Sequence, residues 1–421
     1  MARNGDIRPD IAIIGTDPAG MEIAMSTAAL GVPVTLVVPD EFEPGDTGAA
    51  LQRLRALGVR VISGPCRFLD PRRLQVGDLI VRPRRFVLAT LPRIVPPDIA
   101  GLADLDTPEI RPGSAFLAIG QGRRAVEAAC KARQAGAEVT LLTQGALLSD
   151  FDSESVRLVR INLARAGIAV VDAPLLEGGA VIPASPSGRG PQRRHKLVSR
   201  DEAAFAFDRM FVEGRSETFP DEIEPGEAGI LGRDNRLIVD KALTTTNRHV
   251  LAVGAACGDA DAAVNRAAQV STALGSLLFR RASRHYPALA VRYAPSIPAI
   301  AECGLREDDL GKNDLGKGAR GRHRFYRVRL PDEGISGSIK VITNAKGKLL
   351  GVSIVAARPL DLLPVFQLAM AQGLGIADLA GLPLPSASHA AAIGDLARLG
   401  LREKLFAPST GRLIRLLRVL G

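Results

Sequence analysis

Two glycine turns carry the residues of this sequence whose types and spacing are best suited to chemistry. The first turn, residues 15–20 (GTDPAG), follows the apolar run of residues 11–14, and the second, residues 120–125 (GQGRRA), follows a similar run that starts at Ser114. A glycine turn between a strand and a helix lets the backbone approach a pyrophosphate, which then rests on the amides of the helix N-terminus. Both turns therefore have the spacing of a dinucleotide-binding site.

The two turns differ in how closely they follow the G-x-G-x-x-G/A pattern. In the first turn Gly15 and Gly20 are present, but Asp17 stands where the middle glycine would allow the closest approach. A carboxylate there adds bulk and places a negative charge beside a phosphate. The second turn keeps its three small residues, Gly120, Gly122 and Ala125. We therefore expect any nucleotide at the second turn, and the alternative of a βαβ turn with an empty pocket stays open.

Each turn is positioned by the same order of predicted elements: a strand, the turn, a helix and a second strand. Residues 10–38 show this order first, and residues 114–143 repeat it. Two such units predict two doubly wound α/β domains. Later the pattern changes to long strands, followed by a helix at residues 361–372, which predicts a third, α+β domain. The length of 421 residues fits about three domains.

The composition is that of a folded protein and narrows the classes of partner. Hydrophobic residues make up 46% of the chain and charged residues 24%. Aromatic residues make up only 4%, with no Trp, which argues against base stacking and hence against a nucleic-acid partner. No run reaches the ~18 apolar residues of a membrane span, and the first ten residues lack the apolar core of a signal peptide. We therefore expect a cytoplasmic protein.

The cysteines are isolated from one another in the sequence. No C-x-x-C or metal-ligand spacing occurs, so we expect no metal site. Because disulfides are rare in a reducing compartment, four free thiols are predicted. They are Cys66, Cys130, Cys257 and Cys303.

Residues 396–421 carry a surplus of five positive charges, which is more than half of the formal net charge of +9, and residues 401–421 are predicted to form a basic amphipathic tail. Arg412, Arg415 and Arg418 fall on one side of a predicted helix, and leucines fill the other side. Ser409 or Thr410 is expected to cap this helix. Such helices bind anionic membranes or a partner protein's groove. The remaining alternative is a helix docked on its own domain or on a twin subunit.

Five segments occur along the chain in the following order: the first glycine turn, RFVLATLPRIVPPDIAGL, the second glycine turn, TTTNRHVLAVGAACGD and GSIKVITNAKGKLLGVSIV. In type and order these segments resemble the pyridine nucleotide-disulfide oxidoreductases, flavoproteins that include dihydrolipoamide dehydrogenase and mercuric reductase. The similarity extends from about residue 11 to residue 399. The resemblance implies an FAD-type domain at residues 8–107 and 229–287, an NAD(P)-type domain at residues 108–228 and a dimerisation domain at residues 288–400. It also implies a homodimer.

The resemblance places the family's FAD site at the first turn, where four positions are changed. Besides Asp17, the ribose-binding acid is replaced by Val38. The glycine of the family's Ala-Thr-Gly stretch is replaced by Leu91, and the aspartate that holds the ribityl chain by Ala255. Asp40 lies two residues beyond Val38 and would substitute for the acid only if the strand end bends. We therefore doubt that FAD binds tightly in the family's usual pose.

The family's catalytic groups have no counterpart in this sequence. Its redox dithiol, C-x-x-x-x-C, falls where this chain reads PDEFEPGDTGAALQRLRALG, without a cysteine. Its active-site His and Glu align with Leu384 and His389, and a leucine accepts no proton. A disulfide relay needs two thiols close enough to bond, so no catalytic residue is predicted.

The resemblance places NAD(P)H at the second turn. Glu127 matches the family's helix glutamate, and Gly214 matches the glycine of a G-R-x-P-N phrase near the nicotinamide. The ribose-recognition position is Thr143, which is neither the acid expected for NAD nor an arginine for NADP. Arg123 and Arg124, next to the turn, would favour a phosphate.

Two functions are compatible with these residues. The first is a degenerate homologue, a pseudoenzyme without disulfide reductase activity, which acts as a dimeric scaffold or as a nucleotide-responsive regulatory protein. The second is an FAD-dependent NAD(P)H oxidoreductase that transfers hydride to a small acceptor without a dithiol, because the hydride chemistry belongs to the flavin.

Overall fold

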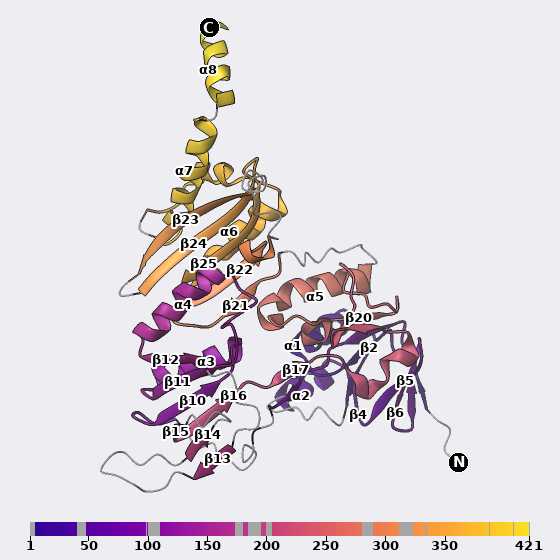
Figure 1. Cartoon of the computed structure of the whole chain (residues 1–421). Helices are drawn as coiled ribbons and strands as arrows, with labels where there is room; N and C mark the ends of the chain where they lie inside the picture. The colour runs from indigo at the N-terminus through magenta and orange to yellow at the C-terminus, as the bar shows by residue number, and fades with distance from the viewer. Residues whose placement is uncertain are drawn as a thin grey trace. The chain divides into compact units, whose positions relative to one another are not determined.

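The chain folds into two compact units of α/β structure (Figure 1). The first unit contains Met1–Val95 and Arg215–Pro287, and the second contains Pro96–Gly214 and Ala288–Gly421. The computed structural model describes residues 5–39, 48–97, 99, 110–172, 180–183, 195–198, 204–279, 289–310, 323–332, 335–386, 388–406 and 408–420.

A five-stranded parallel sheet forms the centre of the first unit. Its order is β20-β8-β2-β3-β4, with bounds Val250–Ala252, Arg85–Leu88, Ile11–Ile14, Val34–Val38 and Arg60–Ser63. The strands β20, β8, β2 and β3 are mostly apolar and buried, because both faces of a parallel sheet are covered. The helices of this unit are α1 (Pro18–Ala29), α2 (Gly48–Ala56) and α5 (Ala262–Phe279), and α1 packs on α5.

Smaller β structures complete the first unit. A four-stranded sheet has the order β1-β7-β6-β5, with bounds Asp6–Ile7, Leu79–Val81, Arg73–Val76 and Cys66–Asp70. Its inner face contributes Phe68 and Leu74 to a core shared with the parallel sheet. Two short antiparallel pairs are β9 (Arg93–Val95) with β17 (Arg215–Glu217) and β18 (Gly232–Arg233) with β19 (Arg236–Leu237).

The second unit contains a four-stranded parallel sheet that repeats the strand order of the first sheet without a counterpart of β20. Its order is β12-β11-β10-β16, with bounds Ile168–Asp172, Glu138–Thr143, Ala115–Ile119 and Arg209–Val212. The helices α3 (Arg123–Gln134) and α4 (Ser153–Arg165) follow β10 and β11. A three-stranded antiparallel sheet lies between β12 and β16 in sequence, and its strands are β13 (Ala180–Pro183), β14 (His195–Val198) and β15 (Ala204–Phe207).

A five-stranded antiparallel sheet forms the other half of the second unit. Its order is β21-β22-β25-β24-β23, with bounds Arg292–Ala294, Ala299–Gly304, Leu349–Ala356, Ile335–Asn344 and His323–Asp332. The helices after it are α6 (Pro359–Ala371), α7 (Ala391–Leu405) and α8 (Pro408–Leu420). Ala294, Ile300 and Val355 belong to the same apolar cluster as α3 and β10, so one core joins the two sheets of this unit.

The tail forms the predicted helix, but the predicted cap is wrong. Helix α8 begins at Pro408, so Thr410 lies inside its first turn, and its hydroxyl donates to the carbonyl of Lys404 at 2.7 Å. The described helices include none that is both long and apolar enough to cross a bilayer.

The predicted fold class is confirmed by this topology. In the first unit β2 lies between β3, the next strand of its sheet along the chain, and β8, which comes later in the sequence. In the second unit β10 lies between β11 and β16 in the same way. Ligands of doubly wound sheets bind at the carboxyl end of the strand where the order reverses. Both glycine turns occupy that position.

Candidate functional site

The first glycine turn connects β2 to α1 and packs tightly against the end of β8. Gly15 has a φ of +102°, and a Cβ at this position would overlap the backbone of Ala89 and Thr90. The amide of Asp17 donates to the carbonyl of Ala89 at 2.9 Å. A Cβ on Gly20 would overlap the side chain of Ala89. Both glycines are therefore required by the packing of the turn itself.

Asp17 fills the space in front of the first turn with its own carboxylate. It is the N-cap of α1, and its Oδ1 accepts from the amide of Ala19 at 2.8 Å. Its Oδ2 accepts from the amide of Ala255 at 3.2 Å, so two of the four changed FAD positions contact each other. Burial raises the pKa of Asp17 above its ordinary value, against the hydrogen bonds from the two amides, which lower it.

The other residues around this turn are mostly apolar or unsatisfied. Val38 is buried at the end of β3, Leu91 follows β8, and Asp40 lies outside the described residues. The hydroxyls of Thr16 and Thr90 are buried and have no hydrogen-bond partner among the described residues. Buried polar groups in proteins are normally paired, so these two hydroxyls mark a place where a polar group would be stabilised.

The second glycine turn connects β10 to α3 and also begins with a glycine at positive φ. Gly120 has a φ of +140°, and its amide donates to the carbonyl of Leu142 at 2.9 Å. A Cβ on Gly120 would lie 2.9 Å from the Cβ of Ala125, which explains why a small residue follows at that position. Gly122 is the N-cap of α3 and provides no side-chain cap for the helix.

Glu213 supplies the missing cap from another strand. Its Oε2 accepts from the amide of Gly122 at 2.7 Å, and its Oε1 accepts from the amide of Arg124 at 3.1 Å. The amide of Glu213 donates to the carbonyl of Ile119 at 2.8 Å, which fixes its backbone beside the end of β10. Sequence reasoning missed Glu213, although it directly precedes Gly214, a predicted site residue.

The two arginines beside the second turn have different roles. Arg123 forms an ion pair with Asp150, donates from Nε to the carbonyl of Tyr293 at 3.1 Å, and lies over the ring of Phe151. The expectation that Arg123 favours a phosphate at the turn is therefore wrong, because its guanidinium is held by Asp150. Arg124 is exposed and contributes its backbone amide to Glu213.

An acidic residue lies beside the predicted ribose-recognition position. Thr143 pairs with Asp172 in the register of β11 and β12, and the Thr143 hydroxyl donates to the Asp172 carboxylate at 2.7 Å. Arg160 donates to the other oxygen at 2.8 Å. Hydrogen bonds from Arg160 and Thr143 hold the pKa of Asp172 below its ordinary value. Asp172 lies at the end of β12, whereas the ribose-recognition position was predicted at the end of β11. A prediction based on β11 alone therefore missed this acid.

Two further predicted residues occupy peripheral positions. Glu127 on α3 forms an ion pair with Lys131 one turn later, with Nζ and Oε1 2.6 Å apart. Gly214 lies between β16 and β17, at the end of one segment of the second unit.

The cysteines show no arrangement suited to redox chemistry. Cys66, Cys130 and Cys303 are buried free thiols, and Cys257 is a half-buried one. Burial raises the pKa of Cys257 and of Cys303 to about 12, and that of Cys130 to about 11. The thiolate, which is the reactive form, is therefore disfavoured at neutral pH for these three. Within the described part of the chain, no group of three potential ligands could hold a metal ion.

The C-terminal positions that replace the family's acid and base lie on the segment before α7. Leu384 is half-buried and packs against the core of the antiparallel sheet. His389 is exposed.

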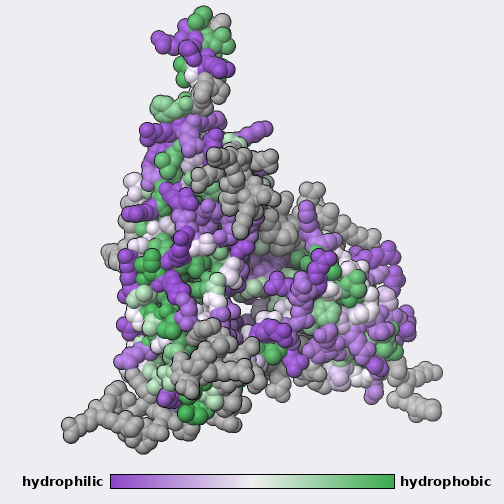
Figure 2. Space-filling view, viewed as in Figure 1, coloured by the Kyte–Doolittle hydropathy of each residue, from purple (hydrophilic) through white to green (hydrophobic). Residues whose placement is uncertain are grey.

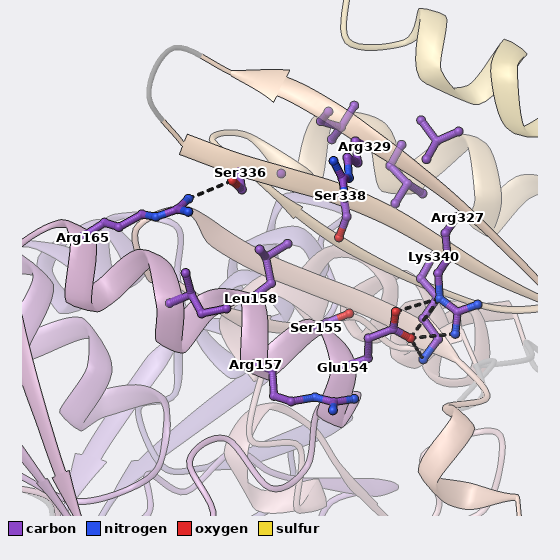
Figure 3. Close-up of a pocket in the computed structure, with 15 residues that line it drawn as sticks. Glu154, Ser155, Arg157, Leu158, Arg165, Arg327, Arg329, Ser336, Ser338 and Lys340 are labelled. Carbon is purple, nitrogen blue, oxygen red and sulfur yellow. Dashed lines mark hydrogen bonds and ion pairs between the residues drawn. The ribbon is translucent and has the colours of Figure 1, made fainter.

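An open groove of about 1050 Å³ lies between α4 and the strands β23 and β24 (Figure 3). At one end, Arg327 pairs with Glu154 at 2.7 Å, and Lys340 pairs with Asp152 at 2.7 Å. Burial alone would raise the pKa of Glu154, but hydrogen bonds from Arg327 and Lys340 lower it to about 2. None of the residues that line the groove belongs to either glycine turn. We interpret the ion pairs as a structural tie within the second unit.

Comparison with known proteins supports the resemblance found in the sequence. No family model matches the chain. Mercuric reductases of Bacillus cereus and Staphylococcus aureus are 22% and 24% identical over alignments of 348 and 342 residues, and each match covers 76% of this chain. These matches cover 52% and 60% of the mercuric reductases, so the chain spans little more than half the length of these curated relatives.

Solved structures share the fold over almost the full length. The HOCl-induced flavoprotein disulfide reductase RclA from Escherichia coli, in a Cu(II) complex, superposes with a TM-score of 0.73 at 19% identity. The match covers 93% of this chain and 99% of that chain. The sequence matches and the shared fold agree with the two glycine turns, and they support the resemblance of this chain to the pyridine nucleotide-disulfide oxidoreductases.

Proposed function

We propose that this chain is a degenerate member of its family, without disulfide reductase activity, which serves as a dimeric scaffold or a nucleotide-responsive regulatory protein in the cytoplasm. The domain division predicted from the sequence is part of the proposal, with the antiparallel sheet as the dimerisation domain. Any nucleotide response is assigned to the second turn, at Gly120, Gly122 and Ala125.

The single observation that carries the proposal is the Asp17 carboxylate. In the family, the pyrophosphate of FAD rests on the amides of the first helix N-terminus. Here Asp17 accepts from the amide of Ala19, and it also accepts from Ala255, where the family's ribityl-binding aspartate would stand. A phosphate would meet both the bulk and the charge of this carboxylate. The residues present do not fit FAD in the family's pose.

The thiols support the same proposal. A disulfide relay requires two sulfur atoms that can bond and one thiolate that can attack. No two cysteines of the sequence lie within five residues of each other, and burial raises the pKa of Cys257, beside the first turn, to about 12. Cys257 donates from Sγ to the carbonyl of Gly254 at 3.0 Å, as a structural thiol does.

Purification in the presence of FAD tests this proposal. We expect a colourless protein without stoichiometric absorbance near ~450 nm, where flavins absorb. FAD is expected to leave its melting temperature unchanged, since only ligands of the native state raise it. A family member that retains its flavin serves as the control. Stoichiometric flavin that survives gel filtration would overturn the proposal.

The second candidate is an FAD-dependent NAD(P)H oxidoreductase without a dithiol. The observation that favours it is the pair of buried, unsatisfied hydroxyls of Thr16 and Thr90 beside the first turn. A polar ligand in a different pose would satisfy them. Oxidation of NADH or NADPH with added FAD and a quinone or dye acceptor distinguishes the candidates. Turnover that requires both FAD and the protein supports the oxidoreductase, and its absence supports the scaffold.

Helix α8 is assigned to an anionic membrane surface as its partner. Five of its apolar residues are between 48% and 83% exposed, namely Leu413, Ile414, Leu416, Leu417 and Val419. Hydrophobic and hydrophilic residues lie side by side on this helix (Figure 2), and its sequence contains no acidic residue. Each arginine near an anionic leaflet contributes about 1 kcal/mol. This assignment predicts binding to phosphatidylserine vesicles that falls when Arg412, Arg415 and Arg418 are changed to Gln. Equal binding to phosphatidylcholine vesicles would contradict it.

The homodimer is tested separately by light scattering of the purified chain. We expect twice the monomer mass, and we expect the chain without residues 408–421 to remain a dimer of its own smaller monomer mass, because the antiparallel sheet and not the tail is assigned to the interface. A monomer at micromolar concentration would contradict the dimeric scaffold.

A further inference from the structure

Both glycine turns have their amides satisfied by a carboxylate of the same chain. At the first turn the acceptor is Asp17, within the turn, and at the second it is Glu213, which lies 91 residues away in sequence from Gly122. A carboxylate resembles a phosphate in charge and in its ability to accept two amide hydrogen bonds, and both groups are stabilised at a helix N-terminus.

Glu213 occupies the space that the second turn leaves for close approach. A Cβ on Gly122 would lie 2.5 Å from Oε1 of Glu213, and a Cβ on Gly120 would lie 2.5 Å from the Cβ of Glu213. The absence of side chains at these glycines therefore makes room for Glu213 itself. A phosphate placed on the amides of Gly122 and Arg124 would have to take the place of this carboxylate.

The protein backbone holds Glu213 in this position. Val212, the last residue of β16, pairs with Ile119, the last residue of β10, and the Glu213 amide donates to the Ile119 carbonyl. The side chain therefore starts beside the end of the central strand and needs only its own length to reach the turn. Arg123 does not offset this negative charge for a ligand, because its guanidinium pairs with Asp150.

We propose that Glu213 is a specificity-determining residue that closes the second glycine turn to pyrophosphate, so that a dinucleotide binds there only by displacing its carboxylate. This inference rests on the proposed function in taking the second turn as the place of any nucleotide response. It makes that response weak in the native chain and strong once the carboxylate is removed.

Isothermal titration with ADP-ribose tests the inference, because this probe carries the pyrophosphate without the nicotinamide. We expect Glu213→Ala to bind ADP-ribose at least tenfold more tightly than the native chain. Glu213→Gln, which keeps one acceptor oxygen and loses the charge, is expected to give an intermediate gain. The matched control is Asp395→Ala, which removes one exposed negative charge from α7 and is expected to leave the affinity unchanged.

Circular dichroism and the melting temperature without ligand establish that each variant is folded. If Glu213→Ala does not fold, the affinity of Glu213→Gln for ADP-ribose tests the inference instead, because this variant retains the shape of the side chain. A folded variant that binds no more tightly than the native chain overturns the inference, as does tight binding by the native chain. The flavin experiment above is independent, since a flavin at the first turn would overturn the scaffold but leave the effect of Glu213 unchanged.

Discussion

The two glycine turns satisfy the same kind of backbone amides with carboxylates of different origin. At the first turn Asp17 caps the helix from the adjacent position in the chain, and its contact with Ala255 closes the turn from the other side. At the second turn Glu213 reaches the amides from the end of a neighbouring strand. The position of Asp17 is fixed by the local geometry of its own turn, whereas the position of Glu213 depends on how the strands of the sheet pair. We therefore expect the first turn to be the more sensitive to substitution.

The largest effect is expected when the glycines themselves are changed. Gly15→Ala should lower the free energy of unfolding by about 3 kcal/mol or more, since the new Cβ overlaps the backbone of Ala89 at a positive φ. Gly120→Ala should cost about 2 kcal/mol, because the new Cβ meets side-chain atoms of Glu213 and Ala125 rather than backbone atoms. Urea denaturation measures both. Gly31→Ala, with a φ of +75° and nothing within 4 Å, isolates the backbone strain. Equal losses at the two turns would break the comparison.

The N-terminus of α4 also lies beside buried carboxylates, and it predicts a dependence of the stability on pH. Asp152 caps α4, and its amide donates to Glu302, which is 1% exposed and whose pKa burial raises to about 7. Between pH ~4.5 and ~7 the folded chain keeps a proton on Glu302 that the unfolded chain releases, so stability falls as pH rises through this window. The fall is on the order of 3 kcal/mol.

Glu302→Gln should remove this part of the fall, as measured by the urea midpoint at pH 5 and pH 8. Glu154→Gln is the control, because the lowered pKa of Glu154, about 2, provides stability that is present above pH ~4.5 and lost only as pH falls toward 2. This control should leave the difference between pH 5 and pH 8 unchanged. A difference that persists in Glu302→Gln would exclude Glu302 as its source.

Substitution of the capping carboxylates is expected to have equal or smaller effects. Asp17→Ala should cost about 2 kcal/mol, because it removes an N-cap and leaves the Ala255 amide without its acceptor. Glu213→Ala should cost about 1 kcal/mol or less, since solvent reaches the half-buried second turn. Thermal denaturation of the two variants at one pH compares them directly. A larger loss for Glu213→Ala would show that the second turn depends more on its cap than the first.

Much of the fold follows from local pattern in the sequence. The apolar runs before Gly15 and Gly120 predict buried parallel strands, and small residues after them predict the helices that became α1 and α3. The long alternating strands near the C-terminus predict the antiparallel sheet. These elements are predictable because the period of hydrophobic residues is a property of a few neighbouring positions. The bounds of α6, Pro359–Ala371, differ by one or two residues from the predicted range of 361–372, as helix ends depend on caps.

The sequence predicted the residues within each glycine turn but not their contacts with other elements. Asp17 at the first turn is visible in the sequence because the G-x-G-x-x-G pattern is itself local. The sequence did not show that Arg123 would pair with Asp150, or that Asp172 would lie beside Thr143. Each of these contacts joins residues on different elements. Residue type alone therefore suggested Arg123 as a phosphate ligand, whereas the structure pairs its guanidinium with Asp150.

By itself the sequence determined two strand, turn and helix units, an acid in the first turn and the separation of the four cysteines. Only the tertiary structure decided that the second turn carries an acid as well. The register of β16 against β10 brings Glu213 to the amide of Gly122, 91 residues earlier in the chain. Register is set by the packing of whole strands, whereas a turn is set by the glycines within it.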